Sequence, residues 1–242
     1  MKAMIFAAGL GTRLKPLTDT MPKALVPIGG KPLLQHAIEK LKAAGFDEII
    51  VNVHHFAGQI IDFVEANHHF GIRIEFSDER EKLLDTGGAI KKASWFFDDG
   101  QPFLIHNVDI LSNIDLRELV AHHQESGSSA ALACSKRQTS RYLLFDDHDL
   151  LKGWINEITG VVKSPIPDFN PSGYQKLAFS GIHVLSPSLF LSMKEMPDKF
   201  SIIDLYLKLC HKISITSYAP GGLQTIDAGK PDSLGEAELF FD

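Results

Sequence analysis

Residues 4–27 read MIFAAGLGTRLKPLTDTMPKALVP and join a short apolar run directly to a loop of small residues with two spaced cations. The run Met4–Phe6 suits a buried strand, and the small residues of 7–12 let a backbone approach a ligand closely. Arg13 can bridge phosphate oxygens with two parallel N–H bonds, and Lys23 offers a compact point charge. The stretch therefore predicts a nucleotide-phosphate site after a first strand, with the N–H groups of the glycine loop facing the phosphates.

Two common phosphate-binding patterns do not fit this loop. Reading from Gly9, Leu14 stands where the third glycine of the dinucleotide-binding pattern G-x-G-x-x-G would be. No Gly-Lys-Ser/Thr follows either, as the pattern G-x-x-x-x-G-K-[ST] requires. The loop belongs to neither class, so the interpretation depends on the longer pattern around it.

The chain has 242 residues, 44% of them hydrophobic and 22% charged, which is typical of a globular protein with ample core. Its formal net charge of −6 argues against a mainly nucleic-acid-binding role, because such binding needs a concentrated positive surface. Cys134 and Cys210 each lie in an apolar stretch, which favours two buried free thiols and a reducing cytoplasm. No stretch approaches the ~20 apolar residues of a membrane span. We expect a cytoplasmic protein that binds neither nucleic acid nor membrane.

The first half of the chain alternates strand-like and helix-like segments, which predicts an α/β fold with a mixed, mainly parallel sheet flanked by helices. Apolar residues recur at helical spacing from Leu33 to Ala44, and Gly45 closes that helix. Asp115 stands where an N-cap would begin another helix. The predicted strands are 3–7, 49–53, 72–76, 103–106 and 129–134, and the predicted helices lie around 33–44, 60–64, 89–96 and 116–120.

The second half is less regular. Segments 142–145 and 151–155 predict a hairpin, and 164–173, with its prolines and glycine, predicts an exposed loop. Ser201 and Asp204 have the spacing of a capping box at the start of a helix. Further predicted elements are strands at 177–184 and 213–218, the helix 202–210 and a last helix from Pro231.

The pattern A-A-G-x-G-T-R-L-x-P-L-T, followed by Pro-Lys at 22–23, resembles the signature of the sugar-1-phosphate nucleotidyltransferases, or nucleotide-sugar pyrophosphorylases. The similarity continues through Leu84–Ile90, Asp109, Phe179–Ile182 and the Asp-x-Gly-x-Pro of 227–231, and so extends over essentially the whole chain. Within the family the chain is most similar to short single-domain members of the N-acetylmuramic acid 1-phosphate uridylyltransferase and mannose-1-phosphate guanylyltransferase-like kind. Those members have no C-terminal β-helix.

The resemblance implies a Rossmann-like fold of the glycosyltransferase-A-like type in one domain over 1–242, with a nucleotide-binding half (1–135) and a sugar-binding half (136–242). It implies an enzyme that uses Mg²⁺ to transfer a nucleotidyl group from an NTP to a sugar 1-phosphate, releasing pyrophosphate. UTP is favoured slightly over GTP, and N-acetylmuramic acid 1-phosphate or mannose 1-phosphate is the favoured acceptor. A non-sugar acceptor such as phosphocholine, or a non-catalytic nucleotide-sugar sensor, stays open as an alternative. The family also implies a homodimer.

The resemblance assigns roles to individual residues. Asp109, at the carboxyl end of the fourth predicted strand, and the distant Asp227 match the two aspartates that hold Mg²⁺ in the family. A hard Mg²⁺ ion prefers one or two carboxylates together with substrate phosphates and water. The other expected site residues are Arg13 and Lys23 for catalysis, Ala8, Gly9, Gly11, Thr12, Gly87 and Gly88 for the nucleotide, and Gly181, Lys163 and Glu157 for the sugar phosphate.

The chain departs from the family pattern in three places. Ala24 replaces the proline that usually follows the cation, and Asn107-Val108 replaces a glycine before the metal aspartate. In the family's E-K-P segment the glutamate is replaced by Val162, and Ser164 separates the lysine from the proline. The first change leaves Lys23 intact, the second keeps the Asp109 carboxylate, and the third leaves the sugar undetermined.

Three adjacent histidine pairs, at 54–55, 68–69 and 122–123, invite a zinc interpretation. We reject it, because neighbouring histidines usually point in different directions and none of these shows H-E-x-x-H or a cysteine at ligand spacing.

Overall fold

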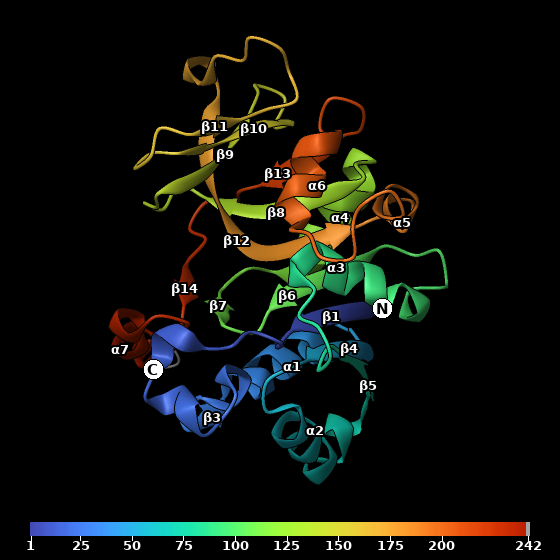
Figure 1. Ribbon diagram of the computed structural model, residues 1–242, viewed down its shortest axis with the longest axis vertical. Helices are drawn as coiled ribbons and strands as arrows, with labels where there is room; N and C mark the ends of the chain where they lie inside the picture. The colour runs from blue at the N-terminus through green and yellow to red at the C-terminus, as the bar shows by residue number, and fades with distance from the viewer. Residues whose placement is uncertain (241–242) are drawn as a thin grey trace.

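The computed structural model describes residues 1–240 and gathers most strands in one sheet (Figure 1). Four neighbouring strands run parallel in the order β6-β1-β4-β5. They are β1 (Lys2–Phe6), β4 (Glu48–Val53), β5 (Arg73–Asp78) and β6 (Phe103–Asn107). The parallel part of the predicted mixed α/β sheet is thereby confirmed.

Helices cover both faces of this parallel part. Successive side chains of a strand point to opposite faces, so Ala3 and Ile5 of β1 lie on one face and Met4 lies on the other. Ala3 and Ile5 pack in one apolar cluster and Met4 in a second. The first cluster contains residues of α1 (Leu33–Ala43), α2 (Ala57–Ala66), α4 (Leu116–Ser126) and α7 (Leu234–Leu239), and the second contains residues of α3 (Asp85–Lys92), α5 (Leu189–Met193) and α6 (Ile202–Leu209). Burial on both faces explains why the strands read as continuous apolar runs. None of the helices in residues 1–240 has the length and apolar character needed to cross a membrane.

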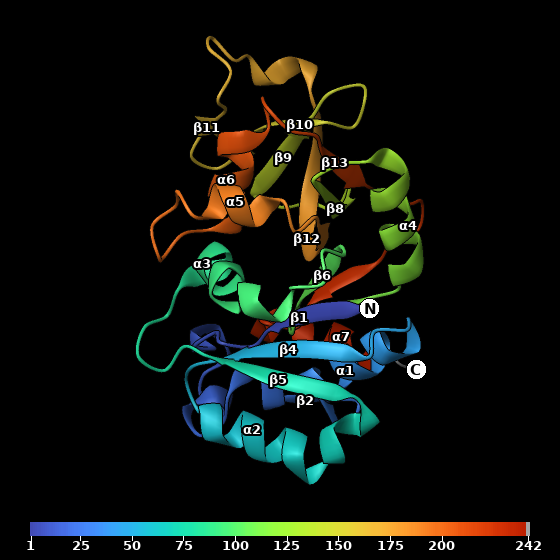
Figure 2. The ribbon, with the colours of Figure 1, turned by 90° about the vertical axis from the view of Figure 1, so that its right-hand side faces the viewer.

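One long strand, β12 (Gln175–Leu185), joins the two halves of the molecule (Figure 2). Its last residues pair antiparallel with β6, and its first residues pair with β9 (Arg141–Phe145). The sheet continues from β9 through β10 (Leu151–Asn156) to β11 (Val162–Lys163), so the predicted hairpin is confirmed. The remaining strands of this sheet are β8 (Ala130–Ser135), which pairs with β12, and β13 (Ile215–Tyr218), which pairs with β8.

Two short ladders lie outside the main sheet. β2 (Pro27–Ile28) pairs with β3 (Lys31–Pro32), directly after the quoted loop. β7 (Ile110–Ser112) pairs antiparallel with β14 (Thr225–Asp227), which brings the end of the chain back to the turn after β6. The second ladder therefore places the closing Asp-x-Gly-x-Pro segment beside the first half.

The start of α4 agrees with its predicted position, and the start of α3 does not. Asp115 caps α4 as predicted, because its Oδ1 accepts bonds from the backbone N–H groups of Arg117 (2.8 Å) and Glu118 (3.3 Å). The predicted start of α3 at 89 was wrong, since the helix begins at Asp85 and already contains Gly87 and Gly88. Their N–H groups donate to the carbonyl of Phe200 (2.9 and 3.2 Å), a long-range partner that local spacing does not reveal.

The predicted capping box at Ser201 is only half present. The Ser201 hydroxyl accepts a bond from the N–H of Ile203 (3.2 Å), so Ser201 is the N-cap of α6. The Asp204 carboxylate lies 3.5 Å from Lys163 Nζ. The Asp204 carboxylate therefore pairs with Lys163 and does not accept the bond from the Ser201 N–H that a capping box requires.

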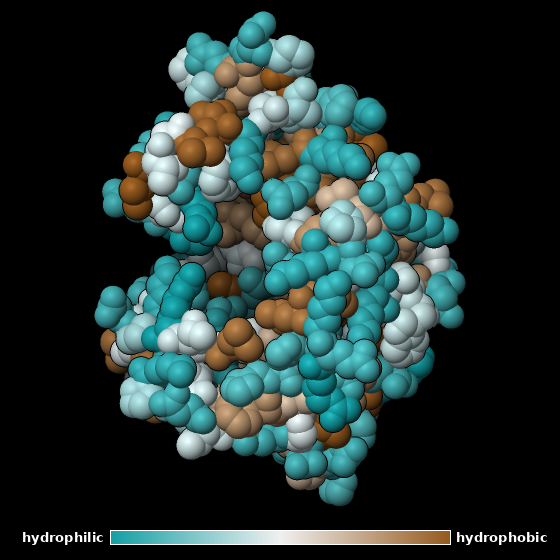
Figure 3. Space-filling model, viewed as in Figure 1, coloured by the Kyte–Doolittle hydropathy of each residue, from teal (hydrophilic) through white to brown (hydrophobic). Residues whose placement is uncertain are grey.

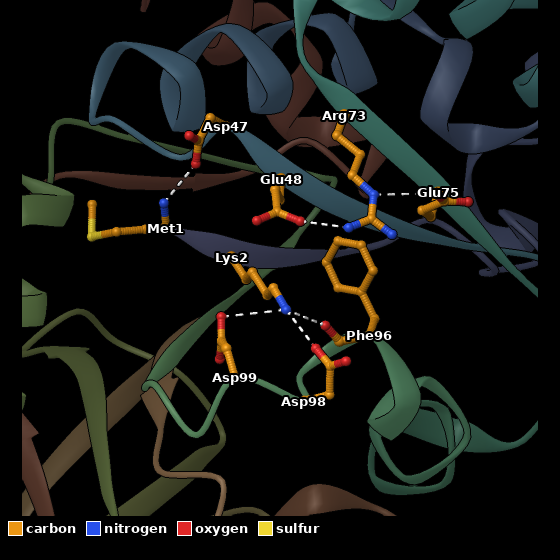
Figure 4. Close-up of polar contacts among 9 residues, drawn as sticks. All are labelled: Met1, Lys2, Asp47, Glu48, Arg73, Glu75, Phe96, Asp98 and Asp99. Atoms are coloured by element: carbon orange, nitrogen blue, oxygen red, sulfur yellow. Dashed lines mark hydrogen bonds and ion pairs between the residues drawn. The ribbon is translucent and has the colours of Figure 1, made fainter.

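Paired charges gather where the parallel strands begin, in what we call the amino-edge cluster (Figure 4). Lys2 Nζ donates to the Phe96 carbonyl and to Asp98 Oδ1, both at 2.8 Å, and lies 3.3 Å from Asp99 Oδ2. The Phe96 ring lies between the Lys2 ammonium and the Arg73 guanidinium, at 5.5 and 5.3 Å from its centroid. The cluster consists of Met1, Lys2, Asp47, Glu48, Arg73, Glu75, Phe96, Asp98 and Asp99.

Candidate active site

A cavity of about 330 Å³ opens at the opposite, carboxyl edge of the parallel strands. Ligands of open α/β sheets bind at this edge, because the loops that follow the strands converge there. Its lining comes from the ends of all four parallel strands or the residues just after them, from Lys23, from residues 83–86 around the start of α3, and from Lys199. The lining residues are Phe6, Ala7, Ala8, Gly9, Lys23, Asn52, Glu79, Leu83, Asp85, Thr86, Asn107, Val108, Asp109 and Lys199.

The glycine loop forms one wall of this cavity. Ala8 and Gly9 line it, and the space where a Cβ of Gly9 would lie has no neighbour within 4 Å. Gly11 turns the loop with φ +65°, and its carbonyl accepts a 2.7 Å bond from the Thr18 hydroxyl. A Cβ at Gly11 would meet Thr18 Cγ2 at 2.8 Å, so this position needs glycine for both backbone and space. Gly11 and Thr12 therefore shape the loop next to the cavity, whereas Ala8 and Gly9 face it.

A chain of buried hydrogen bonds fixes the loop to the neighbouring strands. The Ala7 N–H donates to Asn52 Oδ1 (2.7 Å), and Asn52 Nδ2 donates to Glu79 Oε1 (2.8 Å). Glu79 Oε2 accepts from the N–H of Leu84 (3.0 Å) just before α3. Asn52 and Glu79 are 4% and 1% exposed, and both line the cavity. Neither residue was named from the sequence; for Asn52 the available signal was a polar residue in the apolar run Ile49–Val53.

The central ion pair of the site joins Lys23 to Asp109. Lys23 Nζ lies against Asp109 Oδ2, and both side chains are 17% exposed. Asp109 follows β6, and Lys23 begins a short 3₁₀ helix at 23–25, so the pair connects the quoted loop to the strand end. Gly229 lies over the pair, because a Cβ there would be 2.6 Å from Asp109 Oδ2 and 2.8 Å from Lys23 Cε. Only glycine leaves room for the contact.

Asp227 lies next to Asp109 through the β7–β14 ladder. It is paired in register with Ile110, and the N–H of Ala228 donates to the Asp109 carbonyl (2.9 Å). Burial raises the pKa of Asp227, but the Gly229 N–H bond (3.0 Å) and the nearby ammonium groups of Lys230 and Lys23 outweigh burial and bring the pKa below its ordinary value. Asp227 is therefore an ionised carboxylate beside the lysine–aspartate pair.

These two carboxylates suit a hard cation such as Mg²⁺. Both supply oxygen ligands, and the ammonium of Lys23 already shows that a cation is stabilised at Asp109. Residues 1–240 hold no group of three or more His, Cys, Asp or Glu side chains arranged to bind a metal. The protein would thus contribute one or two carboxylates, and the remaining ligands would be phosphates and water.

Arg13, Gly87 and Gly88 are placed less directly. Arg13 lies in the exposed 3₁₀ helix 12–14, and its side chain has no polar partner within residues 1–240. A Cβ at Gly87 would clash with the Phe200 ring, and one at Gly88 with the Asp198 carbonyl. The close approach that these glycines allow is to residues 198–200, while their neighbours Asp85 and Thr86 face the cavity. Their nucleotide contacts stay a prediction.

A second cavity, of about 410 Å³, lies in the other half of the molecule. Lys163 lines it with Nζ 5.4 Å from the centroid of the Trp154 ring. Gly181, at φ +75° in a bulge of β12, packs against the Asn107 side chain, whose Cγ would lie 2.8 Å from a Cβ there. Glu157 is exposed, pairs with Lys176 (2.7 Å) and does not line this cavity. The sugar contacts of Lys163, Gly181 and Glu157 stay predictions. In Figure 3 a deep notch separates the upper part of the molecule, which carries β9–β11, from the lower part.

The cysteines are free and buried, as predicted. Burial raises the pKa of the Cys134 thiol well above its ordinary value, so this thiol is inert at neutral pH.

The parallel sheet, the glycine loop at its carboxyl edge and the lysine beside two carboxylates define an α/β enzyme of the nucleotide-transferring class. The chain belongs to the nucleotidyl transferase family, whose sequence pattern matches residues 2–145. The resemblance seen in the sequence is thereby confirmed.

Individual relatives agree with this assignment. The chain is 31% identical over 242 residues to the N-acetylmuramate alpha-1-phosphate uridylyltransferase of Caulobacter vibrioides, covering 98% of this chain and 95% of the relative. It is 38% identical over 145 residues to the mannose-1-phosphate guanyltransferase of Gibberella zeae, covering 59% of this chain and 40% of that relative. The fold is shared with HddC from Yersinia pseudotuberculosis, solved in complex with GMP-PN, at a TM-score of 0.78 and 24% identity over 100% of this chain and 99% of that one.

Proposed function

We propose that the protein catalyses Mg²⁺-dependent transfer of a nucleotidyl group from an NTP to a sugar 1-phosphate, forming an NDP-sugar and pyrophosphate. The observation that carries the proposal is the Lys23–Asp109 pair beside Asp227, directly at the cavity that the glycine loop lines. Two anionic reactants must meet in this reaction, and both cations and ionised carboxylates that hold a metal are needed to bring them together.

The chain's own residues have separate tasks in this reaction. Backbone N–H groups of Ala8 and Gly9 face the phosphates of the NTP, while Asn52 holds the loop in place through the Ala7 N–H. Lys23 stabilises the negative charge that develops on the α-phosphate as the sugar phosphate oxygen attacks in line and the bond to pyrophosphate breaks. Arg13, which is exposed at the mouth of the loop, binds the outer phosphates. Asp109 and Asp227 would hold Mg²⁺, which when bound neutralises phosphate charge and aligns the reacting oxygens.

The relatives guide the choice of substrates. The full-length relative is named for uridylyl transfer to N-acetylmuramate alpha-1-phosphate and the partial relative for guanylyl transfer to mannose 1-phosphate. We therefore favour UTP over GTP as donor, and N-acetylmuramic acid 1-phosphate over mannose 1-phosphate as acceptor. In this proposal residues 1–135 bind the nucleotide, residues 136–242 bind the sugar, and the enzyme works in the cytoplasm, where NTPs are available, as a homodimer.

The experiment is a matrix of pyrophosphate release. Each of UTP, GTP, CTP, ATP and dTTP is combined with the 1-phosphates of N-acetylmuramic acid, mannose, glucose and N-acetylglucosamine, with Mg²⁺ or with EDTA. We expect one strongly preferred pair and loss of its turnover in EDTA. Asp227→Asn is expected to raise the Mg²⁺ concentration needed for half-maximal rate at least about tenfold, since it removes one of two charged ligands.

The same matrix separates the alternatives. Nucleotide binding without pyrophosphate release from any pair would replace the proposal with a sensor or with an acceptor outside the sugars. Turnover that is unchanged in EDTA would refute the Mg²⁺ dependence and leave the proposed nucleotidyl transfer intact.

A further inference from the structure

We propose that a cavity between α1 and β7, which we call the α1–β7 cavity, binds a small phosphate compound that also offers a hydroxyl donor. The ligand is free hydrogen phosphate or the phosphate ester of a small polyol. The cavity has a volume of about 350 Å³, close to the 330 Å³ of the active-site cavity. The two cavities share no lining residue, so this is a separate site.

The α1–β7 cavity lies on the other side of β6 from the active-site cavity. His106 and Asn107 are successive residues of β6, so their side chains point to opposite faces of the strand. His106 lines the α1–β7 cavity, and Asn107 lines the active-site cavity. All three residues of β7 also line the α1–β7 cavity, and β7 is the strand that pairs with β14, where Asp227 lies. A ligand bound here would therefore contact the strand that holds the candidate metal carboxylates together.

Lys40 gives this cavity a cation that has no carboxylate partner. Its ammonium donates to the Ser112 carbonyl (2.7 Å) and forms no ion pair within residues 1–240. Burial lowers the pKa of this ammonium below its ordinary value, and the charge of Asp115 offsets burial only in part. Two of its N–H donors remain for a ligand. Because an ammonium that loses water without gaining an anion is unfavourable, the position favours an anionic ligand.

The other lysine of the lining is already neutralised. Lys31 Nζ lies 2.8 Å from Glu39 Oε2, and Gln35 Nε2 donates to Glu39 Oε1 (2.7 Å). Both oxygens of the one carboxylate in the lining are thus bonded on α1 or next to it. Lys40 is the excess positive charge of the cavity.

Two buried polar side chains of the lining lack a hydrogen-bond partner. His106 Nε2 and Ser112 Oγ have none in the part of the chain that the structure describes, residues 1–240, although the two residues are only 1% and 5% exposed. Nearly all buried polar atoms in proteins are bonded to the protein or to another molecule. Both residues line the α1–β7 cavity, so a ligand there would supply the missing partners.

The hydrogen-bonding character of these atoms defines the ligand. His106 Nδ1 lies 2.8 Å from the Asn107 carbonyl oxygen, which can only accept, so Nδ1 carries the proton. Burial lowers the pKa of His106 to about 4, so the ring is neutral at pH 7 and Nε2 is an acceptor. The ligand must donate to His106 and accept from Lys40. Hydrogen phosphate and a phosphorylated polyol do both, whereas sulfate, which carries no proton at neutral pH, only accepts.

The size and apolar part of the cavity admit a short carbon chain. A volume of about 350 Å³ lies in the lower part of the range of small-ligand sites and exceeds what a phosphate ion alone needs. Ala37, Ile110 and Leu111 contribute buried apolar surface to the lining. The cavity can therefore hold the carbon body of a small phosphate ester beside its polar groups.

The test is isothermal titration calorimetry of the full chain with inorganic phosphate, glycerol 3-phosphate, sulfate and glycerol, all without Mg²⁺. We expect both phosphate compounds to bind. Sulfate should bind at this site at least about tenfold more weakly than phosphate, because it cannot donate to His106, and glycerol should not bind. Tighter binding of glycerol 3-phosphate would identify the ligand as a phosphorylated polyol, and tighter binding of inorganic phosphate would identify it as the free ion.

Variants locate the binding, because the active-site cavity also attracts phosphate. Lys40→Met is expected to raise the Kd of the α1–β7 cavity for phosphate at least about tenfold. Lys42→Met is the matched control, since this exposed lysine of α1 donates to the Phe70 carbonyl (2.5 Å), does not line the cavity and should leave binding unchanged. Ser112→Ala is expected to weaken binding about fivefold without lowering the midpoint of thermal unfolding, because its hydroxyl has no partner within residues 1–240.

Three outcomes would overturn the inference. Equal phosphate binding by the wild type, Lys40→Met and Lys42→Met would assign all of it to the active-site cavity. Equal affinity for phosphate and sulfate would contradict the acceptor role of His106 and the ligand class that follows from it. Binding of neither phosphate compound would assign the unpaired atoms of the lining to water. The proposed function would stand in each case, because its test measures pyrophosphate release.

Discussion

The two edges of the same parallel strands use charge in opposite ways. At the amino edge, Lys2 is only 9% exposed in its side chain and is enclosed by a carbonyl and two carboxylates. At the carboxyl edge, Lys23 meets Asp109 beside a cavity of about 330 Å³. Both lysines form ion pairs, but only the second pair faces space that a ligand can enter.

The difference shows what distinguishes a structural ion pair from a reactive one. In the amino-edge cluster every charge has its partner within the chain, and the Phe96 ring fills the space between the two main cations. At the carboxyl edge the Lys23–Asp109 pair brings together two groups that, in the proposed reaction, also bind a phosphate and a metal ion. Disrupting the first edge should therefore affect stability, and disrupting the second should affect the reaction.

The largest expected effect is on the rate, from Lys23→Met. In the proposed reaction Lys23 stabilises the transferring phosphate, so its removal is expected to lower kcat by about 10³-fold. The midpoint of thermal unfolding should change little, because the side chain borders a cavity. Steady-state kinetics with a parallel thermal unfolding curve measure both quantities. Because the substitution removes the ammonium that competes for Asp109, Mg²⁺ should bind at least as tightly as in the wild type. If the variant lost activity because it was unfolded at the assay temperature, the pair would be structural, and its proposed role in the reaction would be contradicted.

Gly229→Ala should reduce the rate less strongly, because it displaces the pair without deleting it. The new methyl group would lie 2.6 Å from Asp109 Oδ2, and the flexible Lys23 side chain must move away. We expect kcat to fall about tenfold with a stability change below about 1 kcal/mol. Gly235→Ala is the control, since a Cβ there meets no atom within 4 Å and alanine favours a helix. Equal kinetics for the two variants would show that the space over the pair is not needed.

At the amino edge, Lys2→Met should lower stability and leave the kinetics unchanged. It deprives the Phe96 carbonyl and Asp98 of their donor, and we expect the free energy of unfolding to fall by about 1–2 kcal/mol. Most of this loss should come from the buried Phe96 carbonyl, because Asp98 is 76% exposed and its ion pair is screened by solvent. Urea unfolding measures the change, and kcat and KM should stay at the wild-type values. A tenfold loss of activity without a loss of stability would break the distinction between the edges.

The smallest expected effect is the pH dependence of the stability difference between the wild type and Lys2→Met. The hydrogen bond from Lys2 is the main cause that holds the pKa of Asp98 below its ordinary value of 3.8. A carboxyl group whose pKa is lowered by folding stabilises the protein above its ordinary pKa, and this contribution is lost as the pH falls through the lowered value. The stability gap between wild type and Lys2→Met should thus be full at pH 7 and narrower near pH 3. Urea unfolding at the two pH values measures this gap in stability. A constant gap would contradict the role of the Lys2–Asp98 bond in lowering the pKa of Asp98.

Most of the fold could be predicted from local patterns. The apolar runs of β1, β4 and β6 are buried on both faces and appear as strands within a residue or two of their expected limits. The α4 cap at Asp115 is a local bond, so its sequence signal was sufficient. The start of α3 was misplaced because the N–H groups of Gly87 and Gly88 bond to Phe200, and nothing near 85–92 in the sequence announces that partner.

The site divides in the same way. The glycine loop and Lys23 could be named from the sequence because the family signature is long and continuous there, and Asp109 because it matches a family aspartate at the end of a predicted strand. Asn52 and Glu79 could not, because each acts through contacts with segments far away in the chain. Their residue types alone are common on any strand or loop.

The sequence by itself determined the α/β class, the family and the identity of the charged residues of the loop, since these depend on short-range spacing and on a contiguous motif. Only the tertiary structure decided that β14 pairs with β7 and places Asp227 beside Asp109, and that Gly229 leaves room for the Lys23–Asp109 contact. The physical reason is that hydrophobic periodicity specifies which face of an element is buried. The register between distant elements follows from packing and long-range hydrogen bonds, which no local pattern encodes.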